Sequence, residues 1–206
     1  MGLTFILAEK QEAAKRIAYA LDDNHSAKLL TKGDVPYFEA TNNGNTLRII
    51  SAVGHLYTIA PKKRGYAYPV FDVHWVAAHN FNRRLAYTKK WIDAIAEVSR
   101  DAAECISATD YDVEGELIGY TTLRFACKEK EREAKRMVFS TLTDVELQRA
   151  FSDLVSELDM YGFIQARVFS HGRYGRTKEI TSNLPKEISD RLRQVILMEF
   201  DLNPIH

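Results

Sequence analysis

The 206-residue sequence has few cysteines, no net charge and no long hydrophobic run, and each absence excludes a class of protein. Its two cysteines, Cys105 and Cys127, have neither a close pair nor a histidine cluster beside them. This spacing argues against a structural zinc site and against a disulfide-rich secreted domain. We therefore expect reduced thiols and a cytoplasmic location. No apolar stretch is long enough to span a bilayer, so no membrane partner is expected.

The charges cancel overall but are unevenly distributed along the chain. Lys and Arg together number 28, as do Asp and Glu, so the sequence lacks the general positive charge of a basic DNA-binding domain. Alternating signs over 128–136 are typical of an exposed helix surface. The segment 82–91 interleaves basic and aromatic residues. It either contacts nucleic-acid phosphates or forms a solvated surface, and the sequence favours neither alternative. The candidates for phosphate contact there are Arg83, Arg84, Lys89 and Lys90.

Hydrophobic periodicity predicts alternating strands and helices. A turn signal from Asn42 to Asn45 lies between two β-prone runs and predicts a hairpin. The fold class is therefore α/β, with a mainly parallel sheet of about four strands and helices on both faces. The predicted strands include 3–9, 104–110 and 136–141, and the predicted helices are 10–21, 88–102, 113–127 and 143–158.

We expect one domain to fill most of the chain, over residues 1–158, because two full cores would be tight in this length. A loop-rich insertion is expected at about 54–87, where proline, glycine, tyrosine and basic residues interrupt the periodicity. Residues 159–206 are polar and turn-prone before a last amphipathic segment. They predict a linker and a terminal helix, which is a C-terminal helical extension of the domain.

Acidic side chains follow two of the predicted strands. Glu9 ends the first strand, and Asp110, Asp112 and Glu114 lie in the run SATDYDVEGELIGY, at and after the end of a later one. Because ligands bind beyond the carboxyl ends of parallel strands, these side chains converge on one crevice if the two strands are neighbours. Their oxygens suit a hard divalent cation such as Mg²⁺. The alternative is an exposed turn whose carboxylates cap the following helix.

The acidic residues and their surroundings resemble the Toprim domain and, more closely, the N-terminal part of archaeal type IA DNA topoisomerases. The supporting segments follow that family's order and cover roughly residues 3 to 158. They are AEKQEAAKRIAYAL (8–21), IISAVGHLY (49–57), YPVFDVHW (68–75), SATDYDVEGELIGY (107–120) and KRMVFSTLTDVELQRAF (135–151). The resemblance implies a Rossmann-like Toprim fold, an isomerase that cleaves and rejoins DNA strands, and bound Mg²⁺ or Mn²⁺.

The resemblance also implies roles for individual residues. Glu9 would move a proton at the cleaved phosphodiester, and Lys10 would stabilise the charge that develops on it. The three carboxylates of the acidic loop (residues 110–114) would hold the divalent metal needed for strand rejoining. Arg136 matches the strand after this loop and is a candidate nucleic-acid contact, together with the basic residues of 82–91. The implied partner is DNA, single-stranded at the site.

The sequence departs from the type IA pattern at two places. Those enzymes usually carry an arginine at this position. This chain has Val113 instead, and archaeal relatives also have an aliphatic residue there, so a phosphate contact from that position is lost. Their further domains, which form a DNA gate and supply the nucleophilic tyrosine, do not fit in 206 residues. We therefore expect a truncated chain that is incomplete alone, and a separate polypeptide that supplies the gate. The alternative is a stand-alone Toprim protein, either a metal-dependent nuclease or a non-catalytic nucleic-acid binding module.

Three further residues each allow two interpretations. Tyr174 begins YGRT, which resembles the surroundings of the family's cleavage tyrosine, yet tyrosine and arginine are common in linkers. His55 matches a family segment, but a histidine beside apolar residues is more often a hydrogen-bonded core residue. Tyr111, inside the acidic loop, either stacks on a nucleic-acid base or packs over the following helix.

Overall fold

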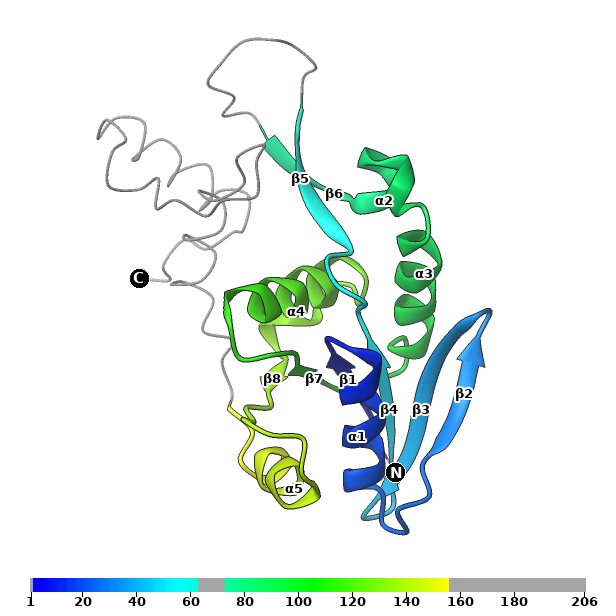
Figure 1. Cartoon of the computed structure of the whole chain (residues 1–206), viewed down its shortest axis with the longest axis vertical. Coiled ribbons are helices and arrows are strands. Elements are labelled where there is room, and N and C mark those ends of the chain that lie inside the picture. The colour runs from blue at the N-terminus through cyan, green and yellow to red at the C-terminus, as the bar shows by residue number, and fades with distance from the viewer. Residues whose placement is uncertain (1, 63–72, 156–206) are drawn as a thin grey trace, which may run out of the picture.

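A six-stranded sheet forms the centre of the protein in a computed structural model that describes residues 2–62 and 73–155 (Figure 1). The strand order is β2-β3-β4-β1-β7-β8. Strand β1 pairs in parallel with β4 and with β7, and β7 pairs in parallel with β8. The edge formed by β2 and β3 is antiparallel. The strands are β1 (Leu3–Ala8), β2 (Lys28–Lys32), β3 (Val35–Asn42), β4 (Asn45–Ser51), β7 (Glu104–Ala108) and β8 (Lys135–Arg136).

Helices cover both faces of this sheet, as predicted. Along β1, Ile6 belongs to a core cluster with helices α1 (Gln11–Leu21) and α5 (Asp144–Ser152). Its neighbour Leu7 belongs to a second cluster, with α3 (Thr88–Val98) and α4 (Val113–Phe125). Because successive residues of a strand point to opposite faces, the apolar run from Phe5 to Ala8 in β1 supplies both cores. The α/β class and the mainly parallel centre are confirmed.

The predicted hairpin joins β3 to β4. Asn42 pairs with Asn45, and the two residues between them, Asn43 and Gly44, have φ values of 49° and 76°. Positive φ at both central positions is the requirement of the tightest hairpin turn, and asparagine followed by glycine meets it at little cost. This turn sets the register in which β3 pairs with β4.

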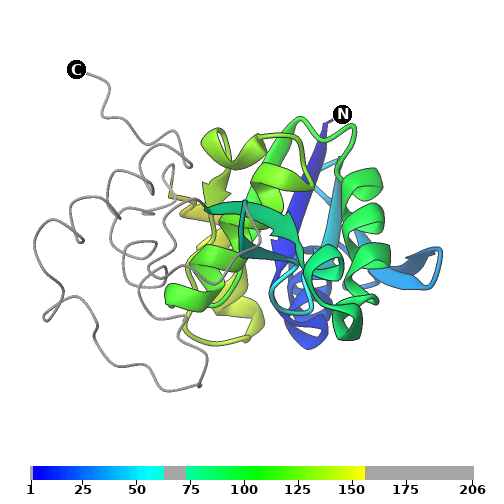
Figure 2. The same ribbon diagram turned by 90° about the horizontal axis from the view of Figure 1, so that it is seen from above.

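The sheet has more strands than the sequence predicts, because β2 gives no hydrophobic signal. Its residues KLLTK are mostly exposed, and it pairs with β3 at the antiparallel edge. Within the expected loop-rich insertion, the described residues form a two-stranded antiparallel sheet of β5 (Tyr57–Pro61) and β6 (Val73–Ala77), followed by α2 (Ala78–Phe81) and the 3₁₀ turn η1 (Arg83–Leu85). Seen from above, this small sheet lies across the end of the central one (Figure 2).

Aromatic packing fixes the small sheet against α4. The rings of Tyr57 and Trp75 lie 5.1 and 6.3 Å from that of Phe125, between ring centroids. Such contacts join residues far apart in the sequence, so local periodicity does not indicate them. None of the helices in 2–62 and 73–155 has the length and hydrophobicity to cross a bilayer. The predicted terminal helix lies outside the described residues.

Candidate active site at the ends of β1 and β7

The carboxyl ends of β1 and β7 lie side by side, which confirms the adjacency on which the predicted crevice depends. The parallel register pairs Thr4 with Glu104 and Ala8 with Ala108. The chain therefore leaves both strands at the same level, and Glu9 follows one end while the acidic loop follows the other. Strand β4 ends beside them, since the amide of Val53 donates a hydrogen bond to the carbonyl oxygen of Glu9.

Lys10 bridges the acidic groups of the two strand ends. Its Nζ lies 2.5 Å from Oδ2 of Asp110 and 3.6 Å from Oε1 of Glu9. The hydrogen bond to Asp110 and the negative charges of both carboxylates raise the pKa of Lys10, so the ammonium stays charged at neutral pH. The Lys10 side chain is largely exposed, and it presents this charge to the solvent side of the crevice.

Glu9 has the environment of a carboxyl group that can hold a proton. Burial is the main cause that raises its pKa, and the nearby carboxylate of Asp110 raises it further, while Lys10 opposes both. The side chain is only 15% exposed. Within the described residues, its Oε2 atom is buried without a hydrogen-bond partner. A proton or a cation would satisfy this oxygen.

The other two carboxylates of the acidic loop have different surroundings. Asp112 is the N-cap of α4, and its Oδ1 accepts a hydrogen bond of 2.7 Å from the amide of Gly115. The capping alternative is therefore observed for one oxygen of this residue. Glu114 is exposed, and its Oε2 lies 3.7 Å from Nε2 of His55. His55 is brought there by the loop after β4, where Val53 and Gly54 have φ values of 52° and 93°.

The donor chemistry fits a hard divalent cation, although the side chains are not gathered around one point. In 2–62 and 73–155, no group of three or more His, Cys, Asp or Glu side chains is arranged to hold one metal ion. Asp110 is bonded to Lys10, and Asp112 is turned toward the helix start. The fit rests on the all-oxygen ligand set and on the buried Oε2 of Glu9, since Mg²⁺ and Mn²⁺ prefer carboxylate and water oxygens.

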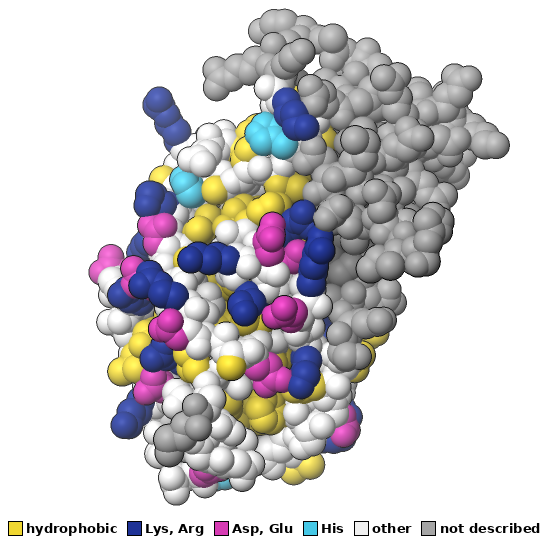
Figure 3. Space-filling view, turned by 180° about the vertical axis from the view of Figure 1, so that it is seen from behind, with side chains coloured by type: hydrophobic (Ala, Val, Ile, Leu, Met, Phe, Trp, Pro, Cys, Tyr) yellow, Lys and Arg dark blue, Asp and Glu magenta, His cyan; other side chains and the backbone are white. Residues whose placement is uncertain are grey.

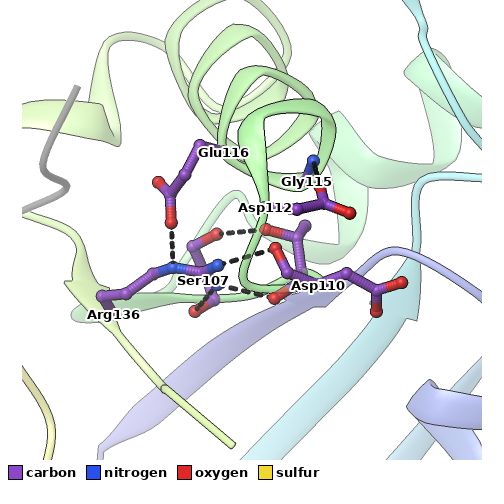
Figure 4. A network of polar contacts seen from close by, with 7 residues as sticks. Ser107, Asp110, Asp112, Gly115, Glu116 and Arg136 are labelled. Atoms are coloured by element: carbon purple, nitrogen blue, oxygen red, sulfur yellow. Dashed lines mark hydrogen bonds and ion pairs between the residues drawn. The ribbon is translucent and has the colours of Figure 1, made fainter. Parts of the chain in front are cut away.

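A buried arginine holds the backbone from which the acidic loop starts (Figure 4). Arg136 is 2% exposed and forms an ion pair with the equally buried Glu116. Its Nη1 donates to the carbonyl oxygens of Ser107 and Thr109 at 3.1 and 2.8 Å, and its Nη2 donates to that of Asp110 at 3.0 Å. The parallel register places Arg136 beside Ser107. One side chain therefore ties the end of β7 to the first turn of α4.

This arrangement corrects the prediction that Arg136 contacts nucleic acid. Its guanidinium faces the protein interior and is used by Glu116 and three carbonyl groups, so it presents no surface to a phosphate. The sequence pattern gave no sign of the structural role of Glu116, which follows the acidic loop as an ordinary helix-start residue. The pairing of Arg136 in β8 with Glu116 in α4 can be recognised only once the strand register is known.

Two glycines let α4 approach the end of β7 closely. A Cβ atom added to Gly115 would lie 2.1 Å from the carbonyl oxygen of Asp110, and one added to Gly119 would lie 2.5 Å from Oγ of Ser107. Both distances are below any normal contact, so these positions admit only glycine without a shift of the backbone or of Ser107. The sequence predictions did not include this contact, although the spacing of the two glycines by about one helical turn could have indicated it.

The basic residues of 82–91 lie on another part of the molecule. Arg83 and Arg84 are exposed on η1, and Lys89 is exposed in the first turn of α3, where it pairs with Asp93 at 2.6 Å. Asn82 caps η1 by accepting a hydrogen bond from the amide of Arg84. The face seen in Figure 3 carries Lys and Arg interspersed with Asp and Glu, and not as one basic patch. Phosphate contact by these residues stays a prediction.

The comparison with protein families matches residues 4–142 to the Toprim domain. The chain belongs to the Toprim domain family. The match includes Glu9, Lys10 and the whole acidic loop, and it ends before α5.

This Toprim chain is similar to archaeal type I topoisomerases. It is 40% identical over 169 residues to DNA topoisomerase 1 of Pyrococcus horikoshii, a match that covers 82% of this chain and 24% of the relative. It is 43% identical over 169 residues to DNA topoisomerase 1 of Methanocaldococcus jannaschii, covering 81% and 21%. The chain thus spans a quarter or less of these relatives.

The fold has a counterpart among solved structures. Full-length topoisomerase I from Thermotoga maritima superposes with a TM-score of 0.52 at 18% sequence identity, over 81% of this chain and 23% of that one. At this identity the likeness concerns the fold alone. It agrees with the mainly parallel sheet flanked by helices that the Toprim chain forms.

A second family matches the C-terminal part of the Toprim chain. Residues 139–191 match the C-terminal winged helix domain of CDC6. The chain is also 48% identical over 62 residues to the ORC1-type DNA replication protein 1 of Methanosarcina mazei, covering 30% of this chain and 14% of that protein. Tyr174 falls within the winged-helix match and outside the described residues. Its YGRT segment therefore has an explanation other than a topoisomerase nucleophile.

Proposed function

We propose that this chain supplies the Toprim part of a type IA DNA topoisomerase, which binds Mg²⁺ or Mn²⁺ and acts on a phosphodiester of single-stranded DNA. The observation that carries the proposal is the meeting of Glu9, Lys10 and Asp110 at the adjacent ends of β1 and β7. The Lys10 ammonium group contacts both carboxyl groups there. Phosphoryl transfer requires such a group of charges at the reacting oxygens.

Each residue has a role that follows from its surroundings. Glu9, half-enclosed and with a raised pKa, donates a proton to the oxygen that leaves during cleavage and accepts one during rejoining. Lys10 places a permanent positive charge beside the non-bridging phosphate oxygens. Asp110, Asp112 and Glu114 would hold the divalent cation, which supplies further charge stabilisation when bound.

A change of DNA topology needs more than this domain. The relatives that carry the name DNA topoisomerase 1 are about four to five times as long as the matched part. We propose that gate domains with the nucleophilic tyrosine act together with residues 1–158, and that a separate polypeptide can provide them. We propose a second unit over residues 159–206, of which 159–191 fall within the winged-helix match, and DNA binding by this unit, which the likeness to a DNA replication protein supports.

The alternative is a stand-alone Toprim protein, either a metal-dependent nuclease with water as the nucleophile or a nucleic-acid binding module without chemistry. The winged-helix match favours the binding module over the nuclease, because the similar relative is named as a DNA replication protein and not as a nuclease. In either case Arg83, Arg84 and Lys89 are proposed phosphate contacts, since they are exposed and lie on one segment.

Incubation with supercoiled plasmid and with single-stranded DNA, in Mg²⁺ or in EDTA, tests the proposal. We expect single-stranded DNA binding that strengthens in Mg²⁺, and relaxation in discrete steps only after a polypeptide with the gate domains is added. Glu9→Gln should then bind DNA normally but relax it far more slowly. Progressive degradation by the chain alone would favour the nuclease. DNA binding that is equal in Mg²⁺ and EDTA, with no relaxation in the reconstituted mixture, would contradict the proposal.

A further inference from the structure

We propose that a cleft beside Lys10 binds one base of single-stranded DNA, stacked on Tyr111, next to the phosphate that reacts. This inference rests on the function proposed above and adds a base-binding subsite to it. The cleft has a volume of about 690 Å³. That is within the range of roughly 300–1,000 Å³ that is usual for ligand sites.

Four segments form the walls of the cleft. They are the start of α1 with Lys10 before it, the acidic loop, the connection 138–142 between β8 and α5, and α5 itself. Lys10 and Asp110 belong to its wall, so a ligand in the cleft lies directly beside the proposed reaction centre. A strand whose phosphate contacts Lys10 therefore has a neighbouring base within reach of this cleft.

Tyr111 has the properties of a stacking platform. Its side chain is 63% exposed, so the structure favours the exposed alternative over packing on the following helix. The guanidinium of Arg136 lies 5.8 Å from the ring centroid. Because Arg136 is itself buried and does not line the cleft, it supports the ring from the protein side. A fixed and exposed aromatic ring binds a base without first losing much side-chain freedom.

The charges of the cleft favour a base over a phosphate. Its wall contains three acidic residues, Glu12, Asp110 and Glu146, and two basic ones, Lys10 and Arg149. Arg149 is already bonded to Glu146 at 2.8 Å. An anionic group would be repelled from the interior, whereas a neutral, planar base is not. The remaining wall is largely apolar and includes Phe139 and Leu142.

A second cavity gives the strand a continuation. It shares Glu12 and Leu142 with the cleft and extends to Arg16 and Val145. Val145 is 79% exposed, and Arg16 is an exposed basic residue of α1. The path from Lys10 along α1 therefore leads first to a cleft with room for a base and then to an open surface, which suits a flexible single strand.

Abasic scanning of a single-stranded oligonucleotide tests the subsite. Binding is measured by fluorescence anisotropy in Mg²⁺ with a set of oligonucleotides, each with one abasic position. The protein should lose affinity about 5- to 150-fold at one abasic position, the effect of one stacked base. Tyr111→Ala should bind the intact strand more weakly by a similar factor and should show no further loss at that position. Tyr111→Phe should behave like the unaltered protein.

Phe81→Ala is the matched control, because Phe81 is an aromatic residue of similar exposure, 59%, that does not line the cleft. It should keep the sensitive abasic position. An unchanged abasic profile in Tyr111→Ala, or equal affinity of Tyr111→Ala and the unaltered protein, would overturn the subsite while leaving the proposed function intact. Absence of any single-stranded DNA binding by the unaltered protein would overturn both.

Discussion

Replacing Arg136 by alanine should be among the most damaging single changes to this protein. The change removes the partner of Glu116 in a pair that is 2% exposed on both sides. It also removes the donors that the carbonyl groups of Ser107, Thr109 and Asp110 use. These groups lie at the end of β7, so the loss acts directly on the position of the acidic loop.

The expected cost follows from the burial of the pair. Removing one partner of a buried ion pair typically costs about 3–5 kcal/mol, against a total domain stability of roughly 5–15 kcal/mol. For a chain of this length the melting temperature should fall by about 6–20 °C, at roughly 2–4 °C per kcal/mol. Glu116→Gln keeps the arginine and its carbonyl partners, so it should cost less, about 1–3 kcal/mol.

Urea and thermal unfolding, followed by circular dichroism, measure these differences. Arg16→Ala is the control, because Arg16 forms an exposed ion pair with Glu12 within one helix. That pair should contribute no more than about 0.5 kcal/mol. Unfolding of Arg136→Ala at the same urea concentration as Arg16→Ala would contradict a structural role of the buried pair. A greater loss of stability in Glu116→Gln than in Arg136→Ala would contradict it as well.

Three further predictions concern the same strand ends. Gly115→Ala should cost about 1–3 kcal/mol in urea unfolding, because its Cβ would meet the Asp110 carbonyl, and a gain in stability would contradict this. In EDTA, Asp112→Ala should lower stability by about 0.5–2 kcal/mol while Asp112→Asn should not, since asparagine also caps helices; equal losses would exclude capping as the cause. In EDTA, the contribution of Glu9 to stability is fully present at a pH below the usual pKa of glutamate. It is lost as the pH rises through the raised pKa of Glu9 in the folded protein. As the pH rises from about 4 to about 7, the free energy of unfolding of Glu9→Gln should therefore increase relative to that of the unaltered protein. A constant difference between the two across this range would contradict this prediction.

The sequence predicts the centre of the fold well because its signals there are local. The apolar run of β1 is typical of a buried parallel strand, and Asn43-Gly44 favours a two-residue hairpin turn. The placement of Glu9 next to the acidic loop then follows from one assumption, that β1 and β7 are neighbours, and the register confirms it.

The parts that the sequence does not predict depend on contacts between distant residues. Strand β2 is mostly polar and is defined by its pairing with β3. Arg136 looks like a surface cation until β8 is placed beside β7, where its guanidinium meets three carbonyl groups. Lys10 was predicted to stabilise phosphate, and its bond to Asp110 is a property of side-chain geometry that no pattern of residue types contains.

Binding of Mn²⁺ is the direct test for a metal site at the ends of β1 and β7, because electron paramagnetic resonance measures free Mn²⁺ without any DNA or partner. The unaltered protein should bind Mn²⁺ at one site, and Asp110→Asn/Asp112→Asn should lose that site. The control Asp34→Asn/Asp101→Asn changes the net charge equally at exposed positions away from the acidic loop, and it should bind as the unaltered protein does. Equal binding by all three proteins would contradict a metal site at the ends of β1 and β7.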